Sequence, residues 1–223
     1  MNNMNQNIKY IVENILDDFY DDTLIDIIDD FLGYKYFPKT KSELQEIIKE
    51  HYKFHNYNLN DIDVSEITDF SCLFYGDKHT CHKDFDVSHW DVSNGVKFSE
   101  MFHHCINFNC DLSKWDVSNG TDFNSMFFHC KKFNSDLSKW DVSKSINFRF
   151  MFSYCISFNS DLSKWDVHNG RDFSYMFVNC EYFNSDLSRW DVSNGQDFNH
   201  MFFGCKNFNS DLSKWNVSGG IFF

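Results

Sequence analysis

Apolar positions recur with a fixed period of 25 residues over most of the chain. One cysteine column and one methionine column keep the same spacing, so the register does not drift. Near-identical units in one register are the signature of a repeat architecture, in which each unit buries its apolar face against its neighbours. The tryptophans that mark the period are Trp90, Trp115, Trp140, Trp165, Trp190 and Trp215.

The first half of each unit predicts a short strand. Leu112, Trp115 and Val117 follow the spacing of leucine-rich repeats. Alternation with polar residues places Trp115 and Val117 on one face of that strand. We therefore expect the strands of successive units to form a parallel ladder, about 4.8 Å apart.

The second half of each unit predicts a turn and a short helix. Asn119 and Gly120 are a turn signal, because glycine accepts a positive φ at little cost. Ser145 replaces that glycine in one unit, which leaves open whether a positive φ is required. Apolar residues over 123–130 then recur at i, i+3, i+4 and i+7, the spacing of one helical face.

Residues 1–58 do not repeat, and they predict a helical cap. Two apolar helical stripes lie within 8–32, and a capping box from Thr40 to Glu43 opens a third helix. Leu44, Ile47 and Ile48 are expected to face inward from it. A cap over the apolar edge of the first repeat and a separate docking domain both fit this pattern.

The predicted fold class is an α/β repeat solenoid, leucine-rich-repeat-like, with one short parallel strand plus one short helix per unit and an N-terminal helical cap. The solenoid covers residues 59–223. It divides into a degenerate first unit (59–86), five full units (87–211) and a truncated unit (212–223).

The repeat resembles the BspA-type leucine-rich repeat on two motifs. They are Phe-Asn-Ser-Asp-Leu-Ser-Lys-Trp-Asp-Val-Ser-Asn-Gly and Met-Phe-x-x-Cys, and the resemblance covers the chain from about Pro38 to Phe223. The resemblance implies a bacterial surface-protein repeat of unassigned function that also occurs in large DNA viruses of protists. The chain begins without the basic and apolar regions of a signal peptide. We therefore expect an intracellular location, in the cytoplasm of a host cell or in a virion.

Composition narrows the class of partner. The chain carries 20 Lys and Arg against 33 Asp and Glu, a formal net charge of −13. Phosphate backbones and anionic membranes both need a basic face, so we expect no nucleic-acid partner. No run of 18 apolar residues predicts a membrane span. Aromatic residues, at 19%, are too frequent for a disordered chain.

Five of the eight cysteines occupy one inward column of the repeat. We expect these five to act as small buried hydrophobic residues. Two alternatives remain open. Cys105 and Cys110 could pair within one unit. A zinc site is the other alternative, although its spacing matches no strong zinc pattern. Its ligands would be Cys72, His79, Cys81 and His82.

Three further columns are polar. Stacked carboxylates such as Asp116 repel one another, so we expect cross-strand ion pairs with the column of Lys114. A divalent cation along the carboxylates is the alternative. Asn109 and its equivalents are expected to form hydrogen bonds with the turn backbone inside the stack.

Nucleophile-elbow, phosphate-loop and dinucleotide-binding motifs are all missing from the sequence. The sequence therefore predicts no enzyme, no catalytic residues, no cofactor and no metal.

Two columns vary between units, those before the methionine and before the cysteine. They are either exposed and free to drift or an aromatic patch that binds a partner. The uniform strand-side face is the alternative binding surface. The aromatic residues concerned are Phe128, Phe150, Tyr154, Tyr175 and Phe203, with Tyr182 just after its cysteine.

The truncated unit ends in Ile221, Phe222 and Phe223, which leaves an apolar edge. Such an edge favours self-association or another subunit. The leading prediction is therefore a non-catalytic scaffold that mediates protein–protein interaction in a larger assembly, such as a viral one. A recognition module for a host protein and a surface adhesin are the alternatives.

Overall fold

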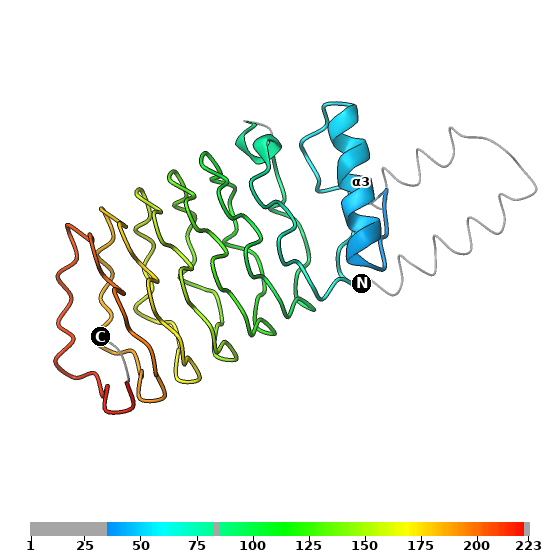
Figure 1. Cartoon of the computed structure of the whole chain (residues 1–223). Helices are drawn as coiled ribbons and strands as arrows, with labels where there is room; N and C mark the ends of the chain where they lie inside the picture. Colours follow the sequence, from blue (N-terminus) through cyan, green and yellow to red (C-terminus); the bar gives the residue numbers. More distant parts are fainter. Residues whose placement is uncertain (1–34, 83–84, 221–223) are drawn as a thin grey trace, which may run out of the picture.

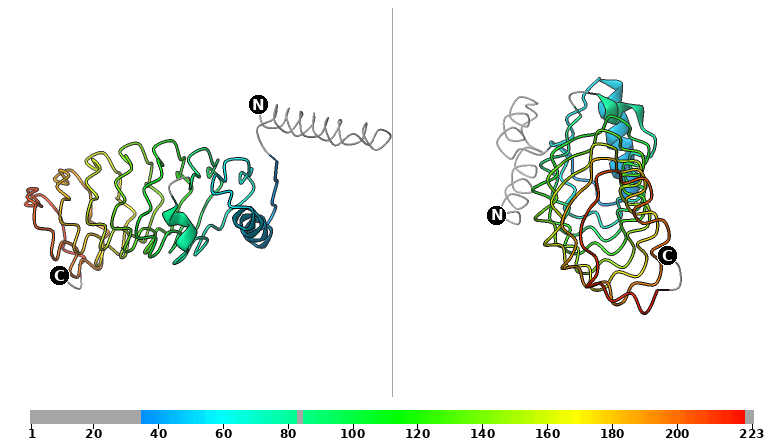
Figure 2. Two further views of the ribbon diagram at one scale, coloured as in Figure 1. Left: turned by 90° about the horizontal axis from the view of Figure 1, so that it is seen from above. Right: turned by 90° about the vertical axis from the view of Figure 1, so that its left-hand side faces the viewer.

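The computed structural model describes residues 35–82 and 85–220. The two helical stripes expected within 8–32 and the apolar residues Ile221, Phe222 and Phe223 lie outside the described residues. From residue 35 onward the chain forms α3 and then winds in successive turns that lie side by side in one row (Figure 1). Viewed from the C-terminal side, the turns are progressively offset, one behind another (Figure 2). We call this row the array.

Helix α3 (Lys41–Lys53) begins where the capping box predicts. The Glu43 N–H donates to Thr40 Oγ1 at 3.2 Å, and Glu43 Oε2 accepts from the Lys39 N–H at 2.6 Å. These bonds satisfy N–H groups that the first helical turn leaves without partners. Leu44 and Ile48 are buried in the same apolar core as the repeats, and Ile47 packs against its edge. The helix therefore covers the N-terminal end of the array.

Over residues 59–82 and 85–220, the repeats contain neither the predicted strand nor the predicted helix. Besides α3, the described residues form one short 3-10 helix, η1 (Lys78–Cys81). The segment predicted as a strand is a tight turn, in which the Trp115 N–H donates to the Leu112 carbonyl at 3.1 Å. Parallel pairing between units is limited to isolated bridges, such as Asp122 with Asn147, five residues beyond Val117.

Residues 123–129 show why no helix forms. The Phe123, Ser125, Phe127 and His129 N–H groups donate to carbonyls of the next unit at 2.8–3.0 Å. In a helix, every N–H would instead bond within its own unit. Ser125 and His129 have positive φ values, 54° and 66°, which a continuing right-handed helix excludes. We call 123–129 and its equivalents, 70–76, 98–104, 148–154, 173–179 and 198–204, the ladder segments.

The turn glycines serve close packing. Gly120 does not have a positive φ, unlike Gly76 and Gly204. A Cβ at Gly120 would lie 2.4 Å from Phe123 Cζ and 3.0 Å from the Val117 carbonyl oxygen. A positive φ is therefore not what favours glycine at this position. Glycine is favoured because the Phe123 ring occupies the space that a side chain would fill.

Stacked rings form the core of the array. Trp115 and Trp140 lie parallel, with ring centroids 6.5 Å apart, and each is 3% exposed. The Trp140 Nε1–H donates to the Leu112 carbonyl of the preceding unit at 3.0 Å. The same bond recurs at every tryptophan of the repeat. Each unit is thereby held to its neighbour by burial and by a satisfied polar group together.

Candidate binding surface

Four cysteines of the column are buried, as predicted, and Cys205 in the last described unit is half-buried. Cys130 donates its S–H to the Phe102 carbonyl of the preceding unit at 3.0 Å. Burial raises the pKa of the Cys155 thiol well above its usual range, so this column stays protonated and unreactive. Cys105 and Cys110 are both free thiols, so their alternative pairing is wrong.

The suggested zinc ligands do not converge among the described side chains. His79 stacks on Tyr52 and His82 stacks on Tyr57, with ring centroids 4.3 and 3.9 Å apart. Cys72 is exposed. Across the described residues, no three His, Cys, Asp or Glu side chains are grouped to hold a metal ion. The Cys81 side chain lies outside them.

The carboxylate column is satisfied locally, and the prediction of cross-strand ion pairs is wrong. Asp116 Oδ1 accepts from the Ser118 N–H at 3.0 Å. Hydrogen bonds from Ser143 lower the pKa of the Asp141 carboxyl. Lys114 and its equivalents form no ion pair with this column within the described ranges. The backbone turn holds the N–H of the residue two positions later beside the carboxylate, so this bond needs no further ordering of a side chain. An ion pair would require an exposed lysine side chain to lose conformational entropy.

The asparagine column bonds backbone, as predicted, but at exposed positions and not inside the core. Asn109 Oδ1 accepts from the Asn134 N–H at 2.8 Å, and Asn134 Oδ1 accepts from the Asn159 N–H at the same distance. This column therefore links units in register along one outer edge of the array.

Exposed and half-buried rings of the ladder segments contact one another from unit to unit. Most side chains at the third, sixth and seventh positions of these segments are exposed or half-buried, and aromatic residues or histidines occupy more than half of the positions. Ser125, Ser153 and Val178 are the buried exceptions. We call this surface the aromatic strip. Its members are Tyr75, His103, His104, Phe128, His129, Phe150, Tyr154, Tyr175, His200 and Phe203.

The strip is continuous across the array. Phe128 stacks on His103 at 4.7 Å on one side. On the other side it meets Phe150 and Tyr154 edge to face, at 5.8 and 5.9 Å. Phe150 then stacks on Tyr175 at 4.6 Å. The structure thus brings four of the predicted aromatic residues into one connected surface.

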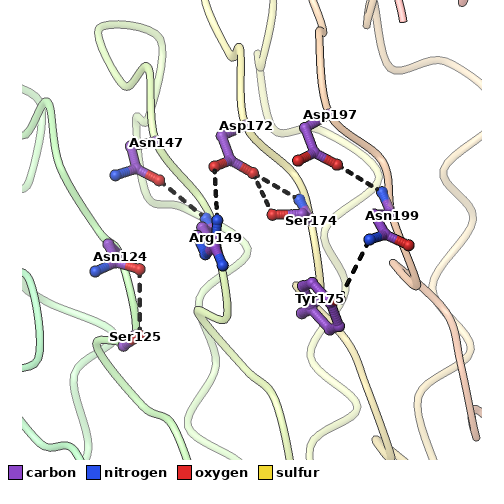
Figure 3. Close-up of polar contacts among 9 residues, drawn as sticks. All are labelled: Asn124, Ser125, Asn147, Arg149, Asp172, Ser174, Tyr175, Asp197 and Asn199. Carbon is purple, nitrogen blue, oxygen red and sulfur yellow. Dashed lines mark hydrogen bonds and ion pairs between the residues drawn. The ribbon is translucent and has the colours of Figure 1, made fainter. Parts of the chain in front are cut away.

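Arg149 adjoins the strip, and its guanidinium group faces the Asp172 carboxylate (Figure 3). Its guanidinium carbon is 5.0 Å from the Phe150 ring centroid and 5.9 Å from that of Tyr175. Its Nη1 is 3.9 Å from Asp172 Oδ2, and the Asn199 side chain donates to the Tyr175 hydroxyl at 3.2 Å. The sequence analysis did not single out Arg149. The signal available was a lone cation in a column otherwise filled by serine and asparagine.

Two other predicted residues lie at or beyond the edge of the strip. Phe203 is 63% exposed and touches only His200 among the described rings. Tyr182 is 58% exposed and makes no ring contact in the part of the chain that the structure describes. Tyr182 is therefore not part of this surface.

A second apolar surface lies on the last described unit. Trp215, Leu212 and Val217 are only half-buried there, although their equivalents in earlier units are buried. Together with Phe198 and Phe202 they line a hollow of about 570 Å³.

None of the helices in the described residues has the length and apolarity needed to cross a membrane.

A family model described as "Mycoplasma protein of unknown function, DUF285" matches residues 42–154 and 138–220. No curated protein and no solved structure matches the chain.

Proposed function

We propose that this chain, which belongs to the family described as Mycoplasma protein of unknown function, DUF285, is a non-catalytic protein-binding repeat protein. Its binding surface is the aromatic strip. The observation that carries the proposal is the continuous contact of outward rings from unit to unit, from Tyr75 to His200. These rings together present one contiguous, partly exposed apolar surface.

The proposal includes the architecture that presents the strip. We assign the array to the BspA-type repeat solenoids, on the motifs quoted above. The parallel bridges that join equivalent residues one unit apart, such as Asp122 with Asn147, support this assignment. Solenoids commonly bind partners over an extended surface that successive repeats build together.

The chemistry of the strip favours a protein partner. Contiguous exposed apolar surface marks interaction sites, and Tyr and Arg are enriched among the residues that dominate binding energy. Arg149, Phe150 and Tyr175 form such a group where Arg149 adjoins the strip.

Charge narrows the partner further. The column beside the strip carries mostly carboxylates, and the chain has a net charge of −13. An extended segment with apolar and basic side chains complements this surface, whereas a nucleic acid does not. The members of the column are Asp69, Lys97, Asp122, Asn147, Asp172 and Asp197.

A displayed peptide library selected against the full chain tests the proposal. We expect apolar, basic segments to be selected. We expect the Tyr154→Ser, Tyr175→Ser double variant to bind them at least about tenfold more weakly, the loss of about 1.4 kcal/mol typical of an interface anchor. Tyr182→Ser is the matched control and should bind normally. Selection of no segment, or equal binding by the double variant, would contradict the strip as the binding surface.

A specific observation favours a second candidate, a scaffold that assembles through the last described unit. The Tyr175 and Phe177 N–H groups donate to carbonyls of the next unit, whereas His200 and Phe202 have no acceptor for theirs within the described residues. These donors border the apolar hollow. A second copy is the occupant to test, by light scattering of the reduced protein over a concentration series. A dimer that Phe202→Asp dissociates supports assembly, and a mass near 26.6 kDa throughout contradicts it.

A further inference from the structure

Three histidines from two successive units meet within the aromatic strip. His103 and His104 have ring centroids 4.5 Å apart, and His104 stacks on His129 at 4.9 Å. Tyr75 and Phe128 pack on the two sides of His103, at 4.4 and 4.7 Å. We call His103, His104 and His129 the histidine triad.

The contact between His103 and His104 requires that at least one of the two imidazoles is neutral. His103 Nδ1 and His104 Nδ1 are 2.8 Å apart. A hydrogen bond at that distance needs one nitrogen that donates and one that accepts, so it cannot survive when both rings are protonated. His129 Nδ1 is buried without a hydrogen-bond partner. A proton added there would bring charge into the strip without compensation.

Among the described residues, no carboxylate is paired with the triad. The flanking titratable groups are Tyr75 and Tyr154, which pack on the outer rings, Lys131 beside His129, and Glu100. Glu100 accepts the His103 N–H through its main-chain carbonyl. No carboxylate in the described residues forms an ion pair with any triad member.

Burial and the neighbouring histidines act in the same direction. Burial, with smaller contributions from His104 and His129, lowers the pKa of His103 to about 4. Burial, with His104 and Lys131, also lowers the pKa of His129. A separated imidazole would titrate near its ordinary value of about 6.5. The packed triad is therefore favoured at neutral pH and loses stability as the pH falls from that value toward 4.

We propose that the histidine triad is a pH-sensitive latch, which holds the N-terminal part of the aromatic strip together while neutral and releases it when acidification charges the imidazoles. The release is a property of the fold alone. Its consequence, weaker binding of a partner at acidic pH, rests on the proposed function of the strip.

Backbone hydrogen exchange of the full chain tests the release. The His104 and His129 N–H groups donate to the next unit at 2.7 and 2.8 Å. Phe177 and Asn179 donate to the next unit in the same way, at 3.0 and 2.8 Å, and lie away from the triad, so they are internal controls. Between about pH 7 and about pH 4.5 we expect the protection factors of His104 and His129 to fall about tenfold relative to the controls, as linked protonation predicts.

The chain itself offers a conservative variant. Asn179 occupies the column of His104 and His129 with a φ of 55°, close to their 61° and 66°. Asparagine tolerates this left-handed conformation well, so a His104→Asn, His129→Asn double variant should fold. We expect it to reduce the excess pH response, because only His103 then remains, lowered in pKa mainly by its own burial, and to keep protection at neutral pH.

Either of two results would overturn the latch. One is an equal pH response at the triad and at the control amides of the wild-type chain. The other is an unchanged response in the double variant. Peptide binding at both pH values separates the two proposals. If Tyr154→Ser, Tyr175→Ser leaves binding intact while the exchange response is present, the binding role fails and the latch stands.

Discussion

Gly120 and Ser145 occupy the same position of successive units, and their difference shows what that position requires. The Phe98 and Phe123 ring centroids are 5.3 Å apart, and Phe148 and Phe173 are 5.4 Å apart. Where Ser145 adds a Cβ, the spacing from Phe123 to Phe148 grows to 6.4 Å. A side chain at this position is therefore accommodated by displacement of the ring beside it.

This comparison predicts the effect of Gly120→Ala. A Cβ would meet Phe123 at 2.4 Å, so the ring must move and the core must loosen. We expect the free energy of unfolding to fall by roughly 1–3 kcal/mol, as for other overpacked cores. Urea unfolding followed by circular dichroism measures the change. Gly219→Ala is the control, since its Cβ would approach no atom closer than 3.5 Å, and it should be neutral.

At the scale of the element, the sequence predicts which side chains are buried better than it predicts the backbone. Phe123, Met126, Phe127 and Cys130 are all buried, as the helical spacing requires. The same spacing is compatible with consecutive turns closed by bonds from i to i−3, and these are what the backbone forms. Periodicity alone does not distinguish the two, because the deciding N–H groups bond to another unit. Positive φ at Ser125 leaves no signal in its residue type.

The aspartate turns are an element whose energetics the sequence misjudges. Like charges stacked from unit to unit suggested a need for lysine partners. The structure instead gives Asp141 the Ser143 N–H, 2.9 Å away, within its own turn. At the equivalent position of the last described unit, Asn216 accepts the Ser218 N–H at 3.2 Å. The turn therefore requires an acceptor, and a negative charge is dispensable.

This reasoning predicts different results for Asp141→Asn and Asp141→Ala. The amide keeps the acceptor, so Asp141→Asn should unfold within about 0.5 kcal/mol of the wild type at pH 7. Asp141→Ala loses the bond and should be destabilised by about 1 kcal/mol. Serine bonds lower the pKa of the Asp141 carboxyl, so its stabilisation is present above the unfolded pKa and is lost as the pH falls through the folded value.

Urea unfolding at pH 7 and at about pH 3 checks this prediction. Asp141→Asn should lose less stability on acidification than the wild type does, because it has no carboxyl to protonate at this turn. An equal loss in both proteins would show that the Asp141 carboxylate does not contribute to acid sensitivity.

At the scale of the whole molecule, the repeat made the register predictable, and the variable columns made much of the strip predictable. Phe128, Phe150, Tyr154 and Tyr175 were found because they differ between otherwise identical units. The sequence does not single out Arg149 or the histidine triad as parts of the strip. Their place in it depends on contacts between side chains of different units, which sequence spacing does not show. Tyr182 lies apart from the strip, which the sequence does not reveal, because spacing alone does not say which way the backbone directs a side chain.

The ladder segments also give the array a direction. In each ladder segment except the last, alternate N–H groups donate to carbonyls of the next unit along the chain. The carbonyls that accept these bonds point back toward the preceding unit. The last described unit therefore presents donors, at His200 and Phe202, and no matching acceptors from the same segment. Two such faces in a symmetric pair would oppose donors to donors in this segment. A second copy that binds at this face must therefore contact the apolar hollow and leave the His200 and Phe202 N–H groups to water.

Stability should also depend on position along the array. Each unit contacts only its neighbours, so a central unit contributes two interfaces and the last described unit contributes one among the described residues. Trp140 is 3% exposed and donates to Leu112, whereas Trp215 is half-buried and donates to Leu187. We expect Trp140→Ala to lower the unfolding free energy by about 3–5 kcal/mol, and Trp215→Ala by clearly less.

Hydrogen exchange shows where each change acts. Trp140→Ala should lower protection in the units on both sides of it, and Trp215→Ala should lower it only near the last described unit. Trp140→Phe, which keeps a large ring and removes the bond to the Leu112 carbonyl, separates packing from hydrogen bonding and should cost about 1–3 kcal/mol. Equal losses at Trp140 and Trp215 would contradict nearest-neighbour stacking, because every unit would then draw its stability from the array as a whole.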